Sequence, residues 1–225
     1  MLQHLKDQFA AYPADFYSHF FLLLPVFIAI YRREFLTPVL WAITLYFTVQ
    51  FVEECVLLYY ALLVKYNHNV TKGTLVLDIL LVGAIYFLSF TTNKFSQKIV
   101  LVATSLAACT ALVNYLSAGP PSISRAIFCL LLIILSLTYF NRILAENRIR
   151  KIVNHSLFWV SAGFLFYGMG TFMTSVFSDY LVVMPKETYD LFSDMGQWVS
   201  IILSVLASVG LWVSKYDKDN YIQPI

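Results

Sequence analysis

Seven long apolar stretches, separated by short polar segments, run along the 225-residue chain. A helix that crosses a bilayer needs about 20 predominantly apolar residues, and each stretch is close to that length. The stretches are Phe16–Tyr31, Pro38–Val64, Thr74–Phe90, Ile99–Ser117, Ser124–Leu144, Leu157–Phe177 and Tyr189–Ser214. We therefore expect an all-α integral membrane protein, a seven-transmembrane-helix bundle that forms a single domain over residues 1–225.

The connections between these stretches are polar or rich in turn residues, as in "KYNHNVTK", "TTNKFSQK" and "SAGPPS". None of them is long enough to form a separate soluble domain. The longest basic connection, "RILAENRIRKIVNH", follows the fifth span. It could continue that helix beyond the membrane, lie on an anionic leaflet, or serve only to set the topology.

The composition supports a membrane protein and excludes a soluble one. The chain is 60% hydrophobic and 12% charged, with a mean hydropathy of +0.73, whereas a soluble domain has about 25% charged residues. The lipid bilayer is therefore the first expected partner. The formal net charge is only +2 and the Lys and Arg residues are scattered between apolar stretches, so no nucleic-acid partner is expected.

The basic residues predict the orientation, because Lys and Arg are retained on the cytoplasmic side of a membrane. With the N-terminus outside, the cytoplasmic connections carry twice as many basic residues as the external ones. The cytoplasmic set is Arg32, Arg33, Lys94, Lys98, Arg142, Arg148, Arg150, Lys151, Lys215 and Lys218, and the external set is Lys6, Lys65, Lys72, Arg125 and Lys186. We therefore expect an external N-terminus and a cytoplasmic C-terminus.

Several strongly polar residues lie inside or at the edges of the predicted spans. An ionisable group in a span costs about 2.5–3.5 kcal/mol on insertion scales, so it normally faces the bundle interior or a wet cavity. With the predicted orientation, these residues lie between the membrane midplane and the outer surface, which indicates a shared polar pocket. The candidates for binding a ligand or a proton are Gln50, Glu53, Glu54, Asp78, Asn114, Arg125, Asp194 and Gln197.

Two adjacent carboxylates lie in the middle of the second span, in "YFTVQFVEECVLLYYALL". Glu53 and Glu54 are about 100° apart around a helix axis, so at most one of them can point straight into the pocket. The other is expected to face a neighbouring helix, a subunit interface or a partner. Two such close acids disfavour ionisation of both, which would allow proton sensing. Alternatively, the network is static, with Arg125 offsetting Asp78 and amides satisfying the glutamates.

Small residues form seams on the last two spans, and in lipid such residues let helix backbones approach closely. We expect them to serve helix packing, although a hinge in the glycine-rich sixth span is the alternative. The residues are Gly163, Gly168 and Gly170 in the sixth span, and Gly196, Ser200, Ser204 and Ser208, which recur every four residues, in the seventh.

The sequence lacks the common motifs of enzymes and cofactor proteins. The four histidines are far apart, and the three cysteines lie singly in apolar stretches, so no metal-ligand spacing occurs. No GxSxG elbow and no phosphate-binding glycine loop is present. The seventh span contains no lysine between Met195 and Val213 that could bind retinal. We therefore expect no catalytic residue, no metal and no cofactor.

The fifth and sixth spans carry a resemblance. At "SRAIFCLLLIILSLTYFNRIL" and "FWVSAGFLFYGMGTFMTSVF", the sequence resembles a group of small seven-span inner-membrane proteins of Bacteroidota. That group is similar to the membrane-embedded sensory or input modules found near signalling kinases. The resemblance implies a multi-pass protein of the cell inner membrane with a signalling or accessory role, and it implies no particular ligand.

These observations favour a receptor-like or signal-coupling membrane protein. Its outer-half polar pocket would act through a membrane or cytoplasmic partner protein, or through a homo-oligomer, because the connections are too short for catalysis. The alternative is an ion channel, a transporter or an oligomeric pore-forming effector with the intramembrane glutamates lining the path. A third hypothesis is a membrane enzyme that acts on lipid and uses the acids as general bases.

Overall fold

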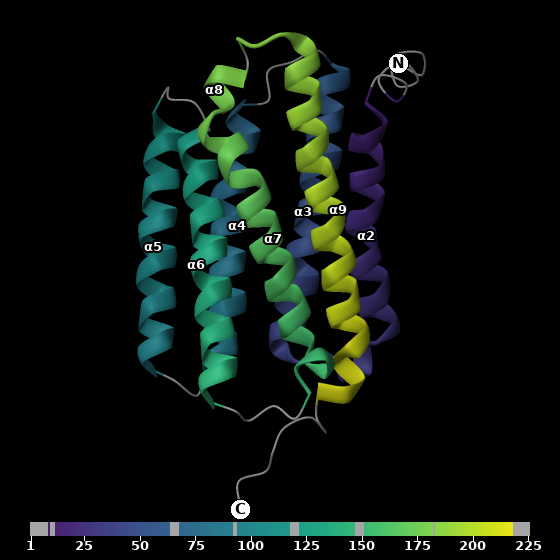
Figure 1. Ribbon diagram of the computed structural model, residues 1–225, viewed down its shortest axis with the longest axis vertical. Helices are drawn as coiled ribbons and strands as arrows, with labels where there is room; N and C mark the ends of the chain where they lie inside the picture. The colour runs from purple at the N-terminus through teal and green to yellow at the C-terminus, as the bar shows by residue number, and fades with distance from the viewer. Residues whose placement is uncertain are drawn as a thin grey trace, which may run out of the picture.

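The chain forms a bundle of long antiparallel helices in the computed structural model (Figure 1). The structure describes residues 9, 12–63, 68–91, 94–117, 122–146, 151–181 and 183–217. Within these residues, seven helices are long and apolar enough to cross a membrane, which confirms the predicted number of spans. They are α2 (Pro13–Tyr31), α3 (Pro38–Leu62), α4 (His68–Ser89), α5 (Lys94–Leu116), α6 (Ser122–Glu146), α7 (Ser156–Val176) and α9 (Lys186–Asp217). Shorter elements are η1 (Arg33–Phe35), η2 (Ile152–Asn154) and α8 (Ser178–Leu181).

Every long helix except α3 begins earlier than the hydropathy pattern predicts. Helix α4 begins at His68 instead of Thr74, α5 begins at Lys94 instead of Ile99, and α9 begins at Lys186 instead of Tyr189. Hydropathy marks only the part of a helix that suits hydrocarbon, whereas backbone hydrogen bonds continue the same helix into polar residues. Part of the "KYNHNVTK" connection is therefore helical. The basic connection after α6 also begins as helix, since α6 extends to Glu146, and residues 147–150 lie outside the described residues.

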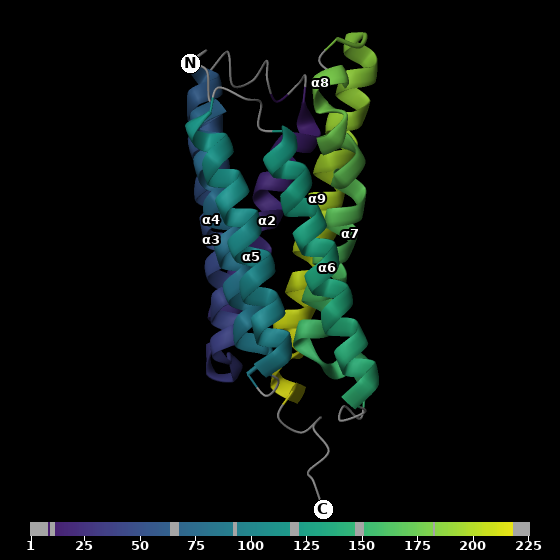
Figure 2. The same ribbon diagram turned by 90° about the vertical axis from the view of Figure 1, so that its left-hand side faces the viewer.

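The helices form a closed ring in which each long helix packs against its neighbours in the chain. Helix α9 contacts both α7 and α2 and so closes the ring, while α4 also contacts α6 across the interior. Figures 1 and 2 show this arrangement from two sides. We call the end that carries the start of α2 the upper end, and the end where α9 finishes the lower end, as both are drawn in Figure 1.

The lower half of the ring is filled by large aromatic side chains. Phe47, Tyr86, Phe90 and Phe164 are all 0% exposed, and the rings of Tyr86 and Phe164 lie 6.3 Å apart. The Tyr86 hydroxyl bonds Ser136 of α6 at 2.9 Å and donates to Ser161 of α7 at 3.1 Å. The buried phenol of Tyr86 is thus satisfied by two other helices, as a polar group in an apolar core requires.

Glycines allow close approach between helices along α7 and α9. A Cβ atom at Gly210 of α9 would lie 2.6 Å from the Ser156 carbonyl oxygen, and one at Gly168 of α7 would lie 3.0 Å from the Cys129 carbonyl oxygen. Gly163 and Gly170 likewise face side chains of α9 at less than ordinary contact distance. The repeat of small residues in the seventh span does not include Gly210. Of these glycines, however, Gly210 makes the tightest backbone contact.

The small residues of the seventh span do not all pack against another helix. Ser204 and Ser208 are buried, but no atom lies within 4 Å of the position that a Cβ would take at Gly196. The expected packing role of Gly196 is therefore wrong. The physical reason is that α7 and α9 diverge towards the upper end (Figure 1), so Gly196 and Ser200 line a cavity instead.

The contrast between the two glycines of α9 gives a matched test of this packing. Alanine has the higher helix propensity by about 1 kcal/mol at either position, but only at Gly210 does the new methyl group meet a backbone atom. We expect Gly210→Ala to lower stability by about 1–3 kcal/mol and Gly196→Ala to leave it equal or higher. Thermal unfolding of both variants in the same detergent measures this difference. A Gly210→Ala midpoint at or above that of Gly196→Ala would contradict the close approach of α7 and α9.

Candidate functional site

A cavity of about 520 Å³ occupies the upper half of the ring. It is lined by residues of every long helix except α5, together with Ser178 and Leu181 of α8. Tyr46, Phe47 and Leu203 are buried lining residues, and the Tyr46 ring lies 5.4 Å from the ring of Phe164 in the aromatic core. The polar lining consists of Tyr46, Gln50, Glu54, Thr71, Ser122, Arg125, Tyr167, Thr171, Thr174, Ser175, Ser178, Tyr189, Ser193, Gln197 and Ser200. The cavity is therefore a polar space that ends blindly on an apolar floor.

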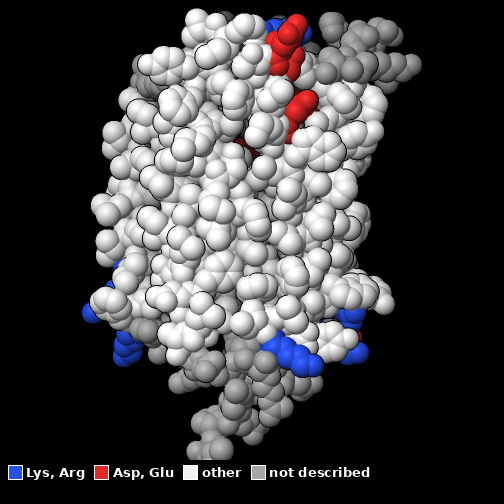
Figure 3. Space-filling model, in the orientation of Figure 1, with Lys and Arg blue, Asp and Glu red and all other residues white. Residues whose placement is uncertain are grey.

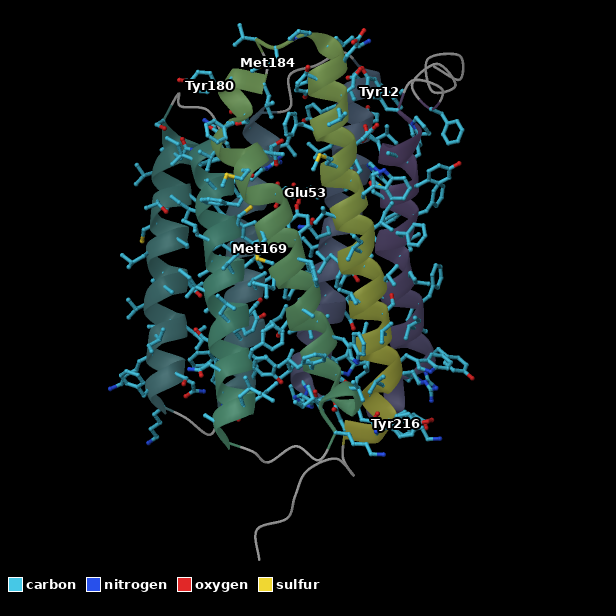
Figure 4. All side chains as sticks on the ribbon, in the orientation of Figure 1. Tyr12, Glu53, Met169, Tyr180, Met184 and Tyr216 are labelled. Atoms are coloured by element: carbon cyan, nitrogen blue, oxygen red, sulfur yellow. The ribbon has the colours of Figure 1, made fainter. Side chains whose placement is uncertain are left out.

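The cavity collects four of the residues that the sequence indicates as a shared pocket, namely Gln50, Glu54, Arg125 and Gln197. Figure 3 shows acidic atoms inside a hollow in the upper half of the face formed by α7 and α9. Figure 4 places Glu53 at a similar depth, in the interior between these two helices. Because α7 and α9 diverge at this end, polar side chains of the helices behind them reach this face.

Glu54 forms an ion pair with a residue that sequence reasoning did not select. Its Oε2 lies 3.1 Å from Nε2 of His19 on α2, and Nδ1 of the same ring contacts the Asp15 carbonyl oxygen. A ring that donates from Nδ1 either donates from Nε2 as imidazolium or accepts there from a protonated Glu54. In both cases one proton lies between the two residues. His19 appeared in the sequence only as a lone histidine near the edge of a span.

Glu53 and Asp78 each accept a hydrogen bond from a neutral side chain on the other residue's helix. Glu53 Oε1 accepts a hydrogen bond from the Thr74 hydroxyl of α4, and Asp78 accepts one from the Gln50 amide of α3. Gln50 thus pairs with Asp78, although its spacing on the helix allowed a bond to either glutamate. The second oxygen of Glu53, Oε2, is buried and has no hydrogen-bond partner among the described residues. The two adjacent glutamates therefore diverge, with Glu54 towards the cavity and α2 and Glu53 towards α4.

Arg125 differs from the expectation that it offsets Asp78. The guanidinium lines the cavity from α6, and no hydrogen bond or ion pair joins it to any residue in the described ranges. Its charge acts on Glu53 and Asp78 at longer range. The cavity lining therefore contains a cationic side chain that has no direct partner among the described residues.

Asn114 and Asp194 also lie outside the cavity lining, as Glu53 and Asp78 do. The Asn114 amide donates to Ser124 Oγ at 2.7 Å and so joins α5 to α6. The Asn114 carbonyl accepts from the buried Lys72 ammonium at 3.2 Å, which places this lysine at the C-terminal end of α5, where a cation is favourable. Asp194 is exposed on α9. Gln197, by contrast, is held at the cavity by Ser18, whose hydroxyl donates to its Oε1 at 2.6 Å.

A second polar cluster lies at the lower end of the bundle. His155, which is 6% exposed, has Nδ1 2.9 Å from Oδ1 of Asp217, the last residue of α9. The same Asp217 oxygen accepts from the Ser156 backbone N–H at 3.0 Å, and the Tyr139 hydroxyl of α6 bonds Nε2 of His155. This cluster ties the end of α9 to the start of α7 and to α6.

Neither cluster forms a metal centre within the described part of the chain, since no group of three or more His, Cys, Asp or Glu side chains has the required arrangement there. The side chains that line the cavity can recognise charge and form hydrogen bonds. No protein-family model, no curated protein and no solved structure matches this chain.

Proposed function

We propose that this chain is a receptor-like, signal-coupling membrane protein. The cavity receives a ligand from the outer side of the membrane, and the lower end of the bundle transmits the resulting change to a partner protein. The observation that carries the proposal is the form of the cavity, which is polar, has the size of a small-molecule site and ends on a closed floor.

The closed floor favours a receptor over a channel that conducts through one chain. Conduction requires a continuous polar path, because an ion in an apolar constriction loses its hydration. Below the cavity, the fully buried side chains of Phe47, Tyr86 and Phe164 fill the space between the described helices. A pore that forms between several subunits would have to run outside this interior.

Helix α9 offers a physical route from the cavity to the lower end. It spans 32 residues, or about 48 Å at 1.5 Å per residue. Gln197 and Ser200 line the cavity in its upper part, and Asp217 contacts His155 at its other end. A ligand that moves the upper part of this continuous helix would alter the polar cluster at the lower end, since helix shifts are a common means of switching.

The charge distribution supports the orientation that such a receptor requires. The described basic residues at the lower end are Arg32, Arg33, Lys94, Lys98, Arg142, Lys151 and Lys215. Figure 3 shows basic side chains along the lower edge of this face and acidic side chains in the upper half. Because basic residues are retained in the cytoplasm, we place the upper end outside and the lower end in the cytoplasm of a cell that holds the protein in its inner membrane.

This orientation predicts which exposed positions react with an external reagent. In a chain without its natural cysteines, a cysteine at Glu187 should react with a membrane-impermeant maleimide added to intact cells. A cysteine at Lys151, which is equally exposed at the opposite end, should react only after the cells are opened. Labelling of Lys151→Cys together with protection of Glu187→Cys in intact cells would invert the topology.

The coupling can be tested without knowing the natural ligand, because a cysteine-linked group can fill the cavity. With Trp41, Trp159 and Trp198 replaced by phenylalanine, Trp212 near the lower end of α9 reports its surroundings by fluorescence. Its ring is stacked on Tyr31 at 6.0 Å and lies 4.1 Å from the Arg32 guanidinium carbon. We expect modification of Ser200→Cys with a methanethiosulfonate ethylammonium reagent to shift the Trp212 emission.

The matched control is Ile202→Cys, which lies two residues further along α9 and is 46% exposed on its outer surface. The same reagent at that position should leave the emission unchanged, because it does not enter the cavity. An equal response at both positions, or none at Ser200→Cys after complete modification, would contradict the proposed coupling.

A further inference from the structure

We propose that the cavity recognises an oxyanion with a single negative charge, such as a carboxylate or a phosphodiester. The inference rests on the proposed function only in taking the cavity as the ligand site. It names the class of ligand from the charge and the hydrogen-bond donors that the lining presents.

Arg125 supplies the positive charge of the cavity. Among the described lining residues it is the one cationic side chain. The side chain is exposed, so a ligand can reach the guanidinium without displacing a protein partner. A guanidinium presents a planar fork of N–H donors, which fits the two oxygens of a carboxylate or a phosphodiester.

The acids of the upper half leave this charge unbalanced. Glu54 also lines the cavity, but it shares one proton with His19, which lies 3.1 Å away, so the pair carries no net charge. Glu53 and Asp78 do not belong to the lining, and each already accepts a hydrogen bond from a neutral side chain. The net charge that the described lining presents to a ligand is therefore positive.

Two phenols of the lining add hydrogen-bond donors. Tyr46 of α3 is only 2% exposed, and both Tyr46 and Tyr167 of α7 line the cavity. Neither hydroxyl has a hydrogen-bond partner within the described ranges. Buried polar groups in folded proteins are normally hydrogen-bonded, and a phenol can donate its O–H. Both hydroxyls are thus available to a ligand that accepts hydrogen bonds.

The three donors lie near one another although they come from three helices. Tyr167 of α7 is within electrostatic range of both Tyr46 of α3 and Arg125 of α6. An oxyanion in the space between these helices can therefore accept from the guanidinium and from the phenols. Hydrogen bonds to an ionised group are about twice as strong as those between neutral groups, so this combination favours an anion over a neutral ligand.

The lining compensates one negative charge and no more. A second negative charge on the ligand would enter without a counter-charge from the described lining residues, and a charge without a partner away from water is costly. A monoanion is therefore favoured over a dianion.

Two sources offer this chemistry. A short carboxylic acid can enter from the outer aqueous side, and phosphatidylglycerol can insert its phosphodiester sideways between α7 and α9, where the molecule is hollowed (Figure 3). Both anions carry one charge spread over two terminal oxygens. The experiment has to include both sources.

The test for the aqueous source uses matched probes on the purified full chain in detergent. Butyrate carries one negative charge, butyramide is its neutral counterpart, butylamine is a cation and succinate is a dianion. We expect butyrate to bind at least 10-fold more tightly than butyramide and butylamine, given the strength of hydrogen bonds to charged groups, and more tightly than succinate. Ligand-observed NMR titrations measure such weak binding.

The test for the lipid source uses native mass spectrometry after reconstitution in mixed nanodiscs. If the ligand is a headgroup, the protein should retain phosphatidylglycerol in preference to phosphatidylcholine, whose phosphodiester is balanced by its own quaternary ammonium. Preference for phosphatidylglycerol or binding of butyrate each supports the oxyanion and identifies its source.

Substitutions then connect binding to the three donors. Arg125→Gln should weaken binding of the favoured probe roughly 10-fold or more, and Arg125→Lys should retain part of it. Tyr46→Phe and Tyr167→Phe keep the rings and remove only the hydroxyls, so each should weaken binding about 10-fold in folded protein. The matched controls are Tyr59→Phe, on the exposed side of α3, and Lys186→Gln, at the same end of the bundle. Both residues lie outside the cavity lining, and their substitution should leave binding unchanged.

Several results would overturn the inference. Butyramide or butylamine binding as tightly as butyrate would remove the need for an anion, and tighter binding of succinate would refute the single charge. Probe or lipid binding that is insensitive to Arg125→Gln and to both phenylalanine variants would place the ligand elsewhere.

The Trp212 assay separates this inference from the proposed function. Absence of binding in both tests, with an intact Trp212 response to modification at Ser200→Cys, would refute the ligand class alone. Binding of a monoanion that depends on Arg125, without any Trp212 response, would support the ligand class and refute the proposed coupling.

Discussion

An ionisable side chain inside a membrane helix has to find a partner within the protein, because hydrocarbon offers none. The upper half of this bundle is arranged around that constraint. Glu53 reaches Thr74, Asp78 reaches Gln50, and Glu54 reaches His19. Each contact joins α3 to a different neighbouring position, on α4 or on α2. The same polar groups that are costly in lipid therefore hold α3 in a defined rotation against α4 and α2.

The lower half follows a different physical rule. Helices α7 and α9 approach closely there, because Gly210 brings the α9 backbone against the Ser156 carbonyl oxygen where a side chain would not fit. Aromatic rings fill the remaining interior, with the Tyr86 hydroxyl bonded to two serines. Close contact between α7 and α9 at this end, together with their divergence at the other end, creates the cavity. The close packing at the lower end and the cavity at the upper end thus both follow from the way α7 and α9 diverge.

A closed lower half and an open upper half suit the transfer of a local change better than the passage of an ion. Interiors at high packing density resist compression, so a displacement of the upper part of α9 has to move the helix rather than deform the core beneath it. The contacts of Asp217 with His155 and the Ser156 backbone lie where such a movement would end. Arg125, by having no direct partner in the described ranges, is the group in the cavity that is most open to an added ligand.

The sequence by itself determined the number of spans and the membrane class, because the thickness of hydrocarbon requires a fixed length of apolar chain that can be counted in one dimension. It also determined that Glu53 and Glu54 point in different directions, since adjacent residues are about 100° apart on any helix. Four of the eight polar candidates indeed line one cavity.

Only the tertiary structure decided the partners of these residues. The pairing of Glu54 with His19, the bond from Gln50 to Asp78, and the positions of Asn114 and Asp194 outside the cavity depend on how each helix is rotated and tilted. The same holds for Gly196, which borders open space, and for Gly210, which touches a backbone. Hydropathy gives depth along the membrane normal but carries no information on rotation about a helix axis or on the crossing of two helices. Those are set by side-chain packing between segments that are far apart in the chain.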